Sequence, residues 1–348
     1  MSFLRLKLTY HPPTLFWYLA IIVGAFAIGG LAVVSTGENP FEALFLLVGY
    51  TFGTARGFYE VIVRAIPLTL AGLGVAVAFR ANVWNIGADG QLMIGAIMGF
   101  WVINTLPGTP TLLMLPLFIV FGAIGGAVWG GIAGWLRARY NASEIIVTIM
   151  LNYIALQALG WVIRGPLQGS VQNYPRSADI PESAMYDVII AGTRVHQGLF
   201  VAAAATILVY LIMRHSSFGF QLRTIGINPN AARYGGVNVR WTIFLTMALS
   251  GALAGLAGVG EIAALHHRLH DDFAPGFGIA AIAVALMARL NPLAIPFTAL
   301  LFGALHVGSG ALQRNLGIPF PIVFLIEGIV IVAFLLAGAV HQRREMAA

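Results

Sequence analysis

The chain has 348 residues, of which 59% are hydrophobic and only 9% are charged, and its mean hydropathy is +0.87. Soluble domains carry about 25% charged residues, so this composition excludes a soluble protein and indicates an integral membrane protein. The net charge of +6 does not indicate nucleic-acid binding, because the basic residues are scattered between apolar segments. The sequence has no cysteine, which excludes a disulfide framework, a thiolate metal site and a cysteine nucleophile.

The apolar segments predict an all-α, polytopic membrane helix bundle. A span needs about 20 mostly apolar residues, and the first apolar run is too long for the apolar region of a signal peptide, about 7 to 15 residues, so it predicts an uncleaved first span. The ten candidate spans are residues 14–35, 59–79, 87–105, 111–136, 144–163, 198–213, 241–263, 278–289, 293–312 and 320–338. Together they predict one transmembrane domain over residues 1–348.

Two apolar stretches differ from the other segments. Residues 278–289 are short and lie between polar stretches, which is typical of a broken or re-entrant helix. Residues 41–52 are too few to cross a bilayer and predict an interfacial helix. Glycine- and alanine-rich helices followed by a polar break occur in both halves of the chain, at TLAGLGVAVAF and at LSGALAGLAGVGEIAAL. This likeness indicates an inverted repeat of the kind found in transporters, although shared composition alone also explains it.

The distribution of basic residues predicts the orientation of the chain. With a cytoplasmic N-terminus, both termini are cytoplasmic, and the inner segments hold more Lys and Arg than the outer ones. The inner residues are Arg5, Lys7, Arg80, Arg137, Arg139, Arg214, Arg223, Arg233, Arg240, Arg289, Arg343 and Arg344, and the outer ones are Arg56, Arg64, Arg164, Arg176, Arg194, Arg268 and Arg314.

The longest polar interruption spans residues 214–240 and falls on the cytoplasmic side in this orientation. Within it, Asn228 and Pro229 begin a short segment that ends at the Gly235-Gly236 pair. An Asn cap, Pro at the first helical position and Gly at the exit predict a short helix. Such a helix is either a surface that another protein grips or part of an ordinary solvated loop.

Several chemistries are absent from the sequence. A P-loop needs a lysine that reaches the nucleotide phosphates, and Lys7 is the only lysine in the chain, so a separate subunit must handle any ATP. The sequence also lacks the HExxH and GxSxG motifs. One cluster has metal-ligand residue types, but we interpret it as a hydrated outer loop and predict no metal site and no cofactor bound by this chain. Its members are His266, His267, His270, Asp271 and Asp272.

Polar side chains inside the apolar segments are candidates for the solute path, because charges in a bilayer are costly. Glu327 lies in the last candidate span, and either contacts solute or bonds to a neighbouring helix, for which His306 or Ser309 is a plausible partner. Thr148 and Asn152 share one helix face and have the same two interpretations. Glu261 lies near the outer end of its span and is interpreted as interfacial.

The segment NIGADGQ contains a second set of candidates, Asn85, Asp89 and Gln91. Their amide and carboxylate groups suit sugar hydroxyls or nucleobase edges, and the two glycines allow close backbone approach. A capped helix start is the alternative, since a carboxylate such as that of Asp89 stabilises a helix N-terminus.

Three motifs in order, FRANVWNIGADGQLMIGA, NASEIIVTIMLNYIA and TIGINPNAARYGGVNV, carry a family resemblance. The chain resembles the permease subunits of bacterial ABC importers for simple sugars and nucleosides, a group that includes ribose and branched-chain amino acid permeases. The resemblance implies a multi-pass protein of the bacterial cytoplasmic membrane. Its implied partners are a cytoplasmic ATPase subunit, a second permease subunit and an extracytoplasmic solute-binding protein.

The resemblance also implies roles for individual residues. The motif that couples such permeases to their ATPase falls on Arg223, Gly226, Asn228, Pro229, Ala231, Ala232, Arg233, Tyr234 and Gly235. The chain departs from the usual pattern at Asp89, where Glu is commoner, and at Glu327, where Gln is frequent. The expected function is solute import driven by ATP on another subunit. The alternatives are a branched-chain amino acid permease and an ion-coupled secondary transporter that uses Glu327 as a proton site.

Overall fold

The structure is a computed structural model, and it describes residues 23–24, 27–106, 108–169, 174–271, 273, 276–319, 321–322, 325, 328–329 and 332–333. Helices joined by loops make up these residues, together with three isolated β-bridges. The helices are α2 (Pro40–Gly53), α3 (Ala55–Arg80), α4 (Ala88–Thr105), α5 (Thr111–Tyr140), α6 (Glu144–Arg164), α7 (Gly198–His215), α8 (Ser217–Ile227), α9 (Pro229–Tyr234), α10 (Val239–Glu261), α11 (Phe277–Met287) and α12 (Ile295–Leu316).

The helices confirm the predicted polytopic bundle. Within the described residues, six helices are long and apolar enough to cross a membrane by length and composition, namely α3, α5, α6, α7, α10 and α12. They coincide with six of the predicted spans, while α4 occupies the predicted span at 87–105. The helix α11 has 11 residues, as the short segment predicted, and α2 is the predicted short helix near residues 41–52. Most of the first and last predicted spans lies outside the described residues.

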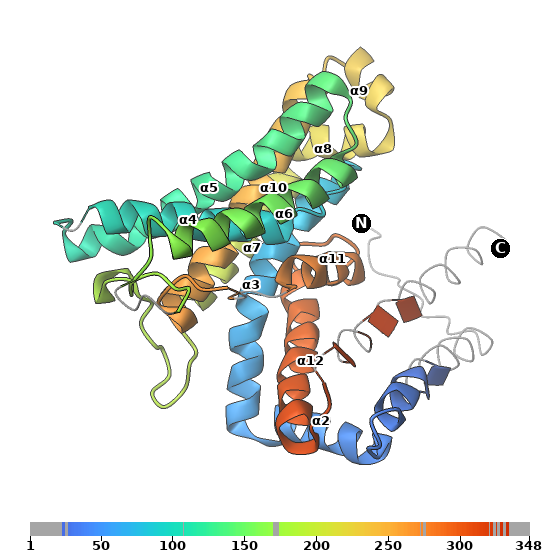
Figure 1. Cartoon of the computed structure of the whole chain (residues 1–348). Coiled ribbons are helices and arrows are strands. Elements are labelled where there is room, and N and C mark those ends of the chain that lie inside the picture. Colours follow the sequence, from blue (N-terminus) through green and yellow to red (C-terminus); the bar gives the residue numbers. More distant parts are fainter. Residues whose placement is uncertain are drawn as a thin grey trace, which may run out of the picture. The chain divides into compact units, whose positions relative to one another are not determined.

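The chain divides into two compact units, one of residues 55–304 and one of residues 1–54 with 305–348. In the smaller unit, Val33 and Ala43 pack with Leu312 and Ile318 in a hydrophobic cluster. In the larger unit, α10 packs along α5 and also contacts α3 and α4 (Figure 1). The helix α3 lies in the interior of this unit, because every residue from 65 to 78 is buried.

Glycines let α10 and α5 approach until their backbones touch. A Cβ atom added to Gly126 of α5 would lie 2.1 Å from the carbonyl oxygen of Gly251 on α10. One turn away, a Cβ atom added to Gly255 would lie 2.3 Å from the carbonyl oxygen of Gly122. Close contact through small residues is the usual way in which membrane helices pack tightly, because lipid provides no hydrophobic driving force between them.

Candidate functional site

The predicted short helix of the polar interruption is α9. The side chain of Asn228 accepts hydrogen bonds from the backbone N–H groups of Asn230 (2.9 Å) and Ala231 (3.1 Å), and Pro229 occupies the first helical position. The chain leaves the helix through Gly236, whose φ of 84° is readily adopted only by glycine. The capped helix predicted from these residue types is confirmed.

One side of α9 is anchored and the other side is exposed. Ala232 is buried in a small cluster with Ile225 of α8 and Val239 of α10. In contrast, the side chain of Ile227 is 86% exposed and that of Tyr234 is 95% exposed. The predicted coupling residues Asn228, Pro229, Ala231, Arg233 and Gly235 are also exposed. The segment therefore presents a fixed, largely exposed knob, the α9 knob, which we define as residues 227–235.

The helix α8 connects the α9 knob to the transmembrane helices. Arg223, another predicted coupling residue, donates a hydrogen bond to the carbonyl oxygen of Met213 at the end of α7. Gly226 lies against the end of α3, since a Cβ atom added to it would be 2.3 Å from the carbonyl oxygen of Arg80. The hydroxyl of Thr242 on α10 donates to the Gln221 side chain at 3.0 Å. The knob is thus held by α3, α7 and α10 together.

A second predicted set of residues forms a buried hydrogen-bonded network that we call the polar joint, made of Asn85, Gln91 and Ser250. The Asn85 Nδ2 donates to Gln91 Oε1 (2.9 Å) and to Ser250 Oγ (2.8 Å), and Gln91 Nε2 donates back to Asn85 Oδ1 (2.9 Å). The Ser250 hydroxyl donates to the Gly74 carbonyl oxygen at 2.6 Å. The joint therefore links α3, α4 and α10.

Three further predicted residues surround the start of α4. Asn152 of α6 donates to the carbonyl oxygen of Ile86 (2.9 Å) and accepts from the backbone N–H of Gly90 (2.9 Å). Asp89 accepts a hydrogen bond from the backbone N–H of Gly278 in α11 at 2.6 Å. The buried Thr148 hydroxyl donates to the Glu144 carbonyl oxygen within its own helix at 2.7 Å.

The structure thus gathers five of the six predicted solute-path residues around one end of α4, while Glu327 lies outside the described residues. Their polar groups bond mainly to protein partners, and the bond of Asp89 goes to the start of α11 and not to its own helix. Their contact with solute remains a prediction. Sequence reasoning missed Ser250, which completes the polar joint. The signal was a hydroxyl in the middle of the glycine- and alanine-rich run of α10.

The loop before the polar joint is held by a buried carboxylate. Glu144, which begins α6, is 7% exposed and lies 3.2 Å from the guanidinium of Arg137 at the end of α5. Its other oxygen accepts from the backbone N–H of Trp84 at 3.5 Å. The second motif of the family resemblance therefore contributes the contact that positions the first.

The histidine-rich segment after α10 lies next to Glu261, whose burial differs from the sequence interpretation. His266 and His270 contact each other through ring nitrogens 3.0 Å apart, but the described residues contain no group of three His, Cys, Asp or Glu side chains that could hold a metal ion. Glu261, interpreted from the sequence as interfacial, is only 2% exposed. Its position at the end of α10 places it under the following turn and not at the surface.

Comparisons with known proteins agree with these features. Residues 57–337 match the family model described as the permease component of branched-chain amino acid transport systems. The chain is 35% identical to a glucose ABC transporter permease protein of Haloferax volcanii, covering 97% of this chain and 89% of that protein.

Two further relatives are transport proteins of bacteria. A guanosine ABC transporter permease protein of Bacillus subtilis is 34% identical over 90% of both chains. A nucleoside ABC transporter permease protein of Lactococcus lactis subsp. cremoris is 33% identical, covering 90% of this chain and 88% of that one. With its capped helix α9 and its bundle of apolar helices, the chain belongs to the permease-component family of the branched-chain amino acid transport systems and their sugar and nucleoside ABC relatives.

Proposed function

We propose that this chain is the transmembrane subunit of an ATP-driven importer that carries a nucleoside or a simple sugar across the cytoplasmic membrane. The observation that carries the proposal is the α9 knob, which is capped, anchored through Ala232 and exposed at Ile227 and Tyr234. An exposed knob of this kind suits a groove on another protein. Because the only lysine is Lys7, we assign ATP binding to a cytoplasmic ATPase subunit that receives the knob.

The proposed assembly has further members and a defined orientation. We place both termini and the α9 knob in the cytoplasm, on the basis of the excess of Arg and Lys in those segments. A second permease subunit completes the transmembrane path, and an extracytoplasmic solute-binding protein delivers the solute. In this assembly the membrane subunit itself has no ATPase site.

The contacts of α8 and α9 supply a route for coupling. Movement of the knob reaches α10 through Val239, which packs with Ala232, and reaches the end of α3 through Gly226. The carbonyl of Arg80 at that end lies five residues before Asn85 of the polar joint. Rigid packing between these helices transmits a displacement of the knob to the centre of the bundle.

The relatives guide the choice of solute. They are named for glucose, guanosine and nucleosides, and each of these solutes carries adjacent hydroxyl groups. Amide and carboxylate groups such as those of Gln91 and Asp89 suit hydroxyl recognition if the bundle opens around them. A branched-chain amino acid has no such hydroxyl groups, so competition experiments separate the two classes.

Uptake of labelled guanosine, uridine, glucose and leucine into cells that express the complete importer tests the proposal. We expect uptake of a nucleoside or glucose, and we expect depletion of ATP to abolish it. Uptake of leucine alone would replace the proposed solute class with branched-chain amino acids. Uptake by this chain alone in ion-loaded vesicles without ATP would establish a secondary transporter instead.

The role of the α9 knob has a separate test. Arg233→Ala changes an exposed position, so we expect this variant to fold and to enter the membrane normally, whereas an insertion beside Ala231 also shifts the buried Ala232. We expect both variants to reduce uptake by about tenfold or more while the ATPase subunit still hydrolyses ATP. Full uptake in both variants would rule out the coupling role of the knob.

A further inference from the structure

The outer end of α10 is covered by a loop that we call the outer strap, residues 174–197. Beyond Glu261 the helix widens into a π-helical turn, Ile262–His266, and the chain then turns at His267 with a φ of 55°. The strap pairs with this end through backbone hydrogen bonds from Tyr186 to Ala263 (3.0 Å) and from Ile180 to His267 (2.8 Å). Single π-helical turns are frequent at functional sites.

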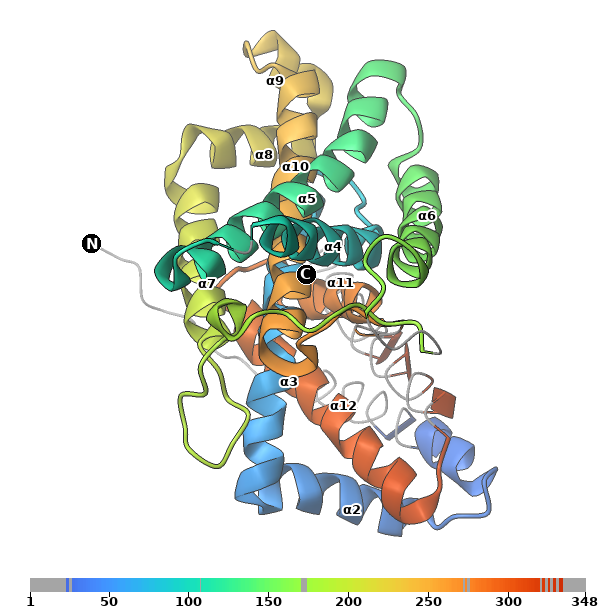
Figure 2. The same cartoon turned by 60° about the vertical axis from the view of Figure 1, so that its left-hand side comes forward.

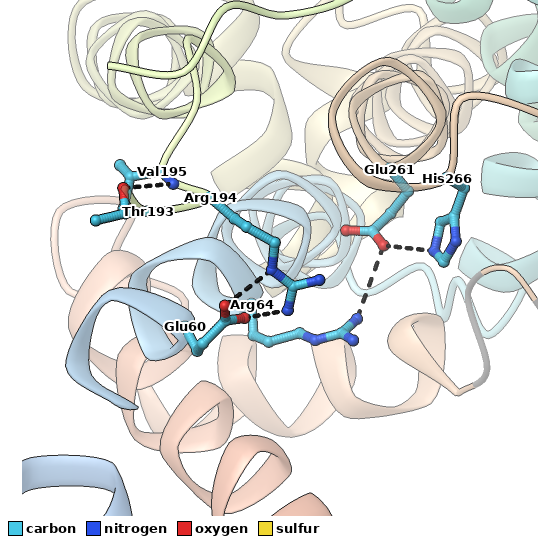
Figure 3. Close-up of polar contacts among 7 residues, drawn as sticks. All are labelled: Glu60, Arg64, Thr193, Arg194, Val195, Glu261 and His266. Atoms are coloured by element: carbon cyan, nitrogen blue, oxygen red, sulfur yellow. Dashed lines mark hydrogen bonds and ion pairs between the residues drawn. The ribbon is translucent and has the colours of Figure 1, made fainter. Parts of the chain in front are cut away.

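A cluster of ionisable side chains lies at the same end of α10 as the outer strap. The carboxylate of Glu261 is 2% exposed, with the guanidinium of Arg64 on α3 at 3.8 Å and the ring of His266 at 3.4 Å (Figure 3). Neither Glu261 Oε2 nor His266 Nε2 has a hydrogen-bond partner in the part of the chain that the structure describes. Buried charges are normally both paired and hydrogen-bonded, so this cluster is held by attraction without good hydrogen-bond geometry.

A second ion pair joins the strap to α3. Arg194 of the strap bonds to Glu60, which lies one helical turn before Arg64 on α3 (Figure 3). Two guanidinium nitrogens of Arg194 donate to the two carboxylate oxygens of Glu60, and the side chain of Glu60 is only 16% exposed. The strap is therefore fastened to α3 at this edge by a bidentate ion pair, which opening has to break.

The strap and the α9 knob lie at opposite ends of the same helix. Figure 1 and Figure 2 both show α9 beyond one end of α10 and the loop that precedes α7 near the other. A helix of 23 residues spans roughly 35 Å. Because glycines hold α10 against the α5 backbone, α10 connects the two ends as a stiff element.

We propose that Glu261 is a positioning residue that keeps the outer end of the permease closed through Arg64 and His266, and that the outer strap separates from α10 during each transport cycle. The proposal rests on the proposed function, because it places the strap on the extracytoplasmic side. Opening breaks both contacts of Glu261, and loss of its carboxylate leaves Arg64 without this partner in the closed state.

Cysteine labelling tests this gate without any solute. The chain has no native cysteine, and the buried Ala263 lies directly beneath the strap, so an Ala263→Cys chain carries one thiol that a closed strap protects. In intact cells with a membrane-impermeant maleimide, we expect adding Glu261→Gln to speed labelling by about tenfold or more. Glu261→Asp, which keeps the charge, should remain slow, as should the matched control Glu182→Gln on the exposed part of the strap. Equal rates in all four chains would overturn the proposal.

A reversible cross-link tests whether the strap must move. Arg176 in the strap and His270 after α10 form an antiparallel β-bridge, and such pairs lie within the range that a disulfide can span. We expect oxidised Arg176→Cys/His270→Cys importer to lose uptake by about tenfold or more and to regain it with a reductant. The same double-cysteine importer kept in reductant provides the control without the cross-link.

The outcomes separate the two proposals. Full uptake by the cross-linked Arg176→Cys/His270→Cys importer would overturn the gate and leave the importer function intact. If the unmodified importer takes up none of the tested solutes, the proposed function fails, whereas the maleimide rates still decide whether Glu261 holds the strap closed. Thermal unfolding of each purified variant identifies any Glu261→Gln effect that arises from general loss of the fold.

Discussion

The carboxylate of Asp89, in the first turn of α4, accepts a 2.6 Å hydrogen bond from the backbone N–H of Gly278, in the first turn of α11. The first N–H groups of a helix have no partner within the helix and carry a partial positive charge. Asp89 therefore satisfies the start of a helix that lies 189 residues further along the chain. This contact joins α4 to α11, whose relative positions the sequence alone does not determine.

Removing the Asp89 carboxylate should destabilise the bundle. We expect Asp89→Ala to lower the free energy of unfolding by about 1 to 3 kcal/mol, because the N–H of Gly278 loses a charged acceptor. Asp89→Asn keeps a carbonyl oxygen and should lose less. Thermal unfolding of the detergent-purified chain measures both effects, and an Asp89→Ala chain that unfolds at the wild-type temperature would show that the bond contributes nothing.

The glycine contact between α5 and α10 should tolerate no side chain. Gly251→Ala places a methyl group 2.1 Å from the carbonyl oxygen of Gly126, so the helices must separate. We expect a loss of about 1 to 3 kcal/mol in the free energy of unfolding. Gly260→Ala is the matched control on the same helix, because no atom lies within 4 Å of its added Cβ. This control should be neutral or slightly stabilising, by up to about 1 kcal/mol.

Two variants of the α9 knob should differ in how they affect the free energy of unfolding and the uptake of solute. Tyr234 is 95% exposed, so Tyr234→Ala should change the free energy of unfolding by less than about 0.5 kcal/mol. We nevertheless expect it to reduce uptake, because the ring is available to the ATPase subunit. Asn228→Ala should reduce both uptake and stability, because the missing helix cap lowers the free energy of unfolding by about 1 kcal/mol. Unfolding temperature and uptake measured on the same preparations decide this prediction, which a fully active Tyr234→Ala would contradict.

The buried His196 should make the free energy of unfolding depend on pH. Burial lowers the pKa of its imidazole from 6.5 to about 4, while nearby Glu261 opposes this shift. The unfolded chain therefore binds this proton more readily than the folded chain between these pH values, and stability falls as the pH falls. From pH 7 to pH 5 we expect His196 to account for a loss of about 2 kcal/mol.

Comparison of unfolding temperatures at pH 7 and pH 5 measures the His196 contribution. His196→Gln has no titrating ring, so its unfolding temperature should decrease less over this interval than that of the wild-type chain. An identical decrease in the wild-type chain and His196→Gln would contradict the prediction.

The sequence by itself determined the class of protein, most of the apolar helices and the α9 helix. These features depend on local chemistry, because about 20 apolar residues suffice to specify a span. Likewise, an Asn-Pro start and a Gly exit specify a short helix within ten residues. The same local pattern located Asn85, Asp89 and Gln91 around the start of a helix, and α4 begins there, at Ala88.

Only the tertiary structure determined which residues are partners. Ser250 completes the polar joint from a position 165 residues away from Asn85, and Arg64 reaches Glu261 from another helix. In an apolar chain, periodicity shows where a helix lies but not which face meets which neighbour, because both lipid and protein favour the same side chains. Glu261 was interpreted as interfacial from its place near the end of its span, whereas the structure buries it beside Arg64 and His266.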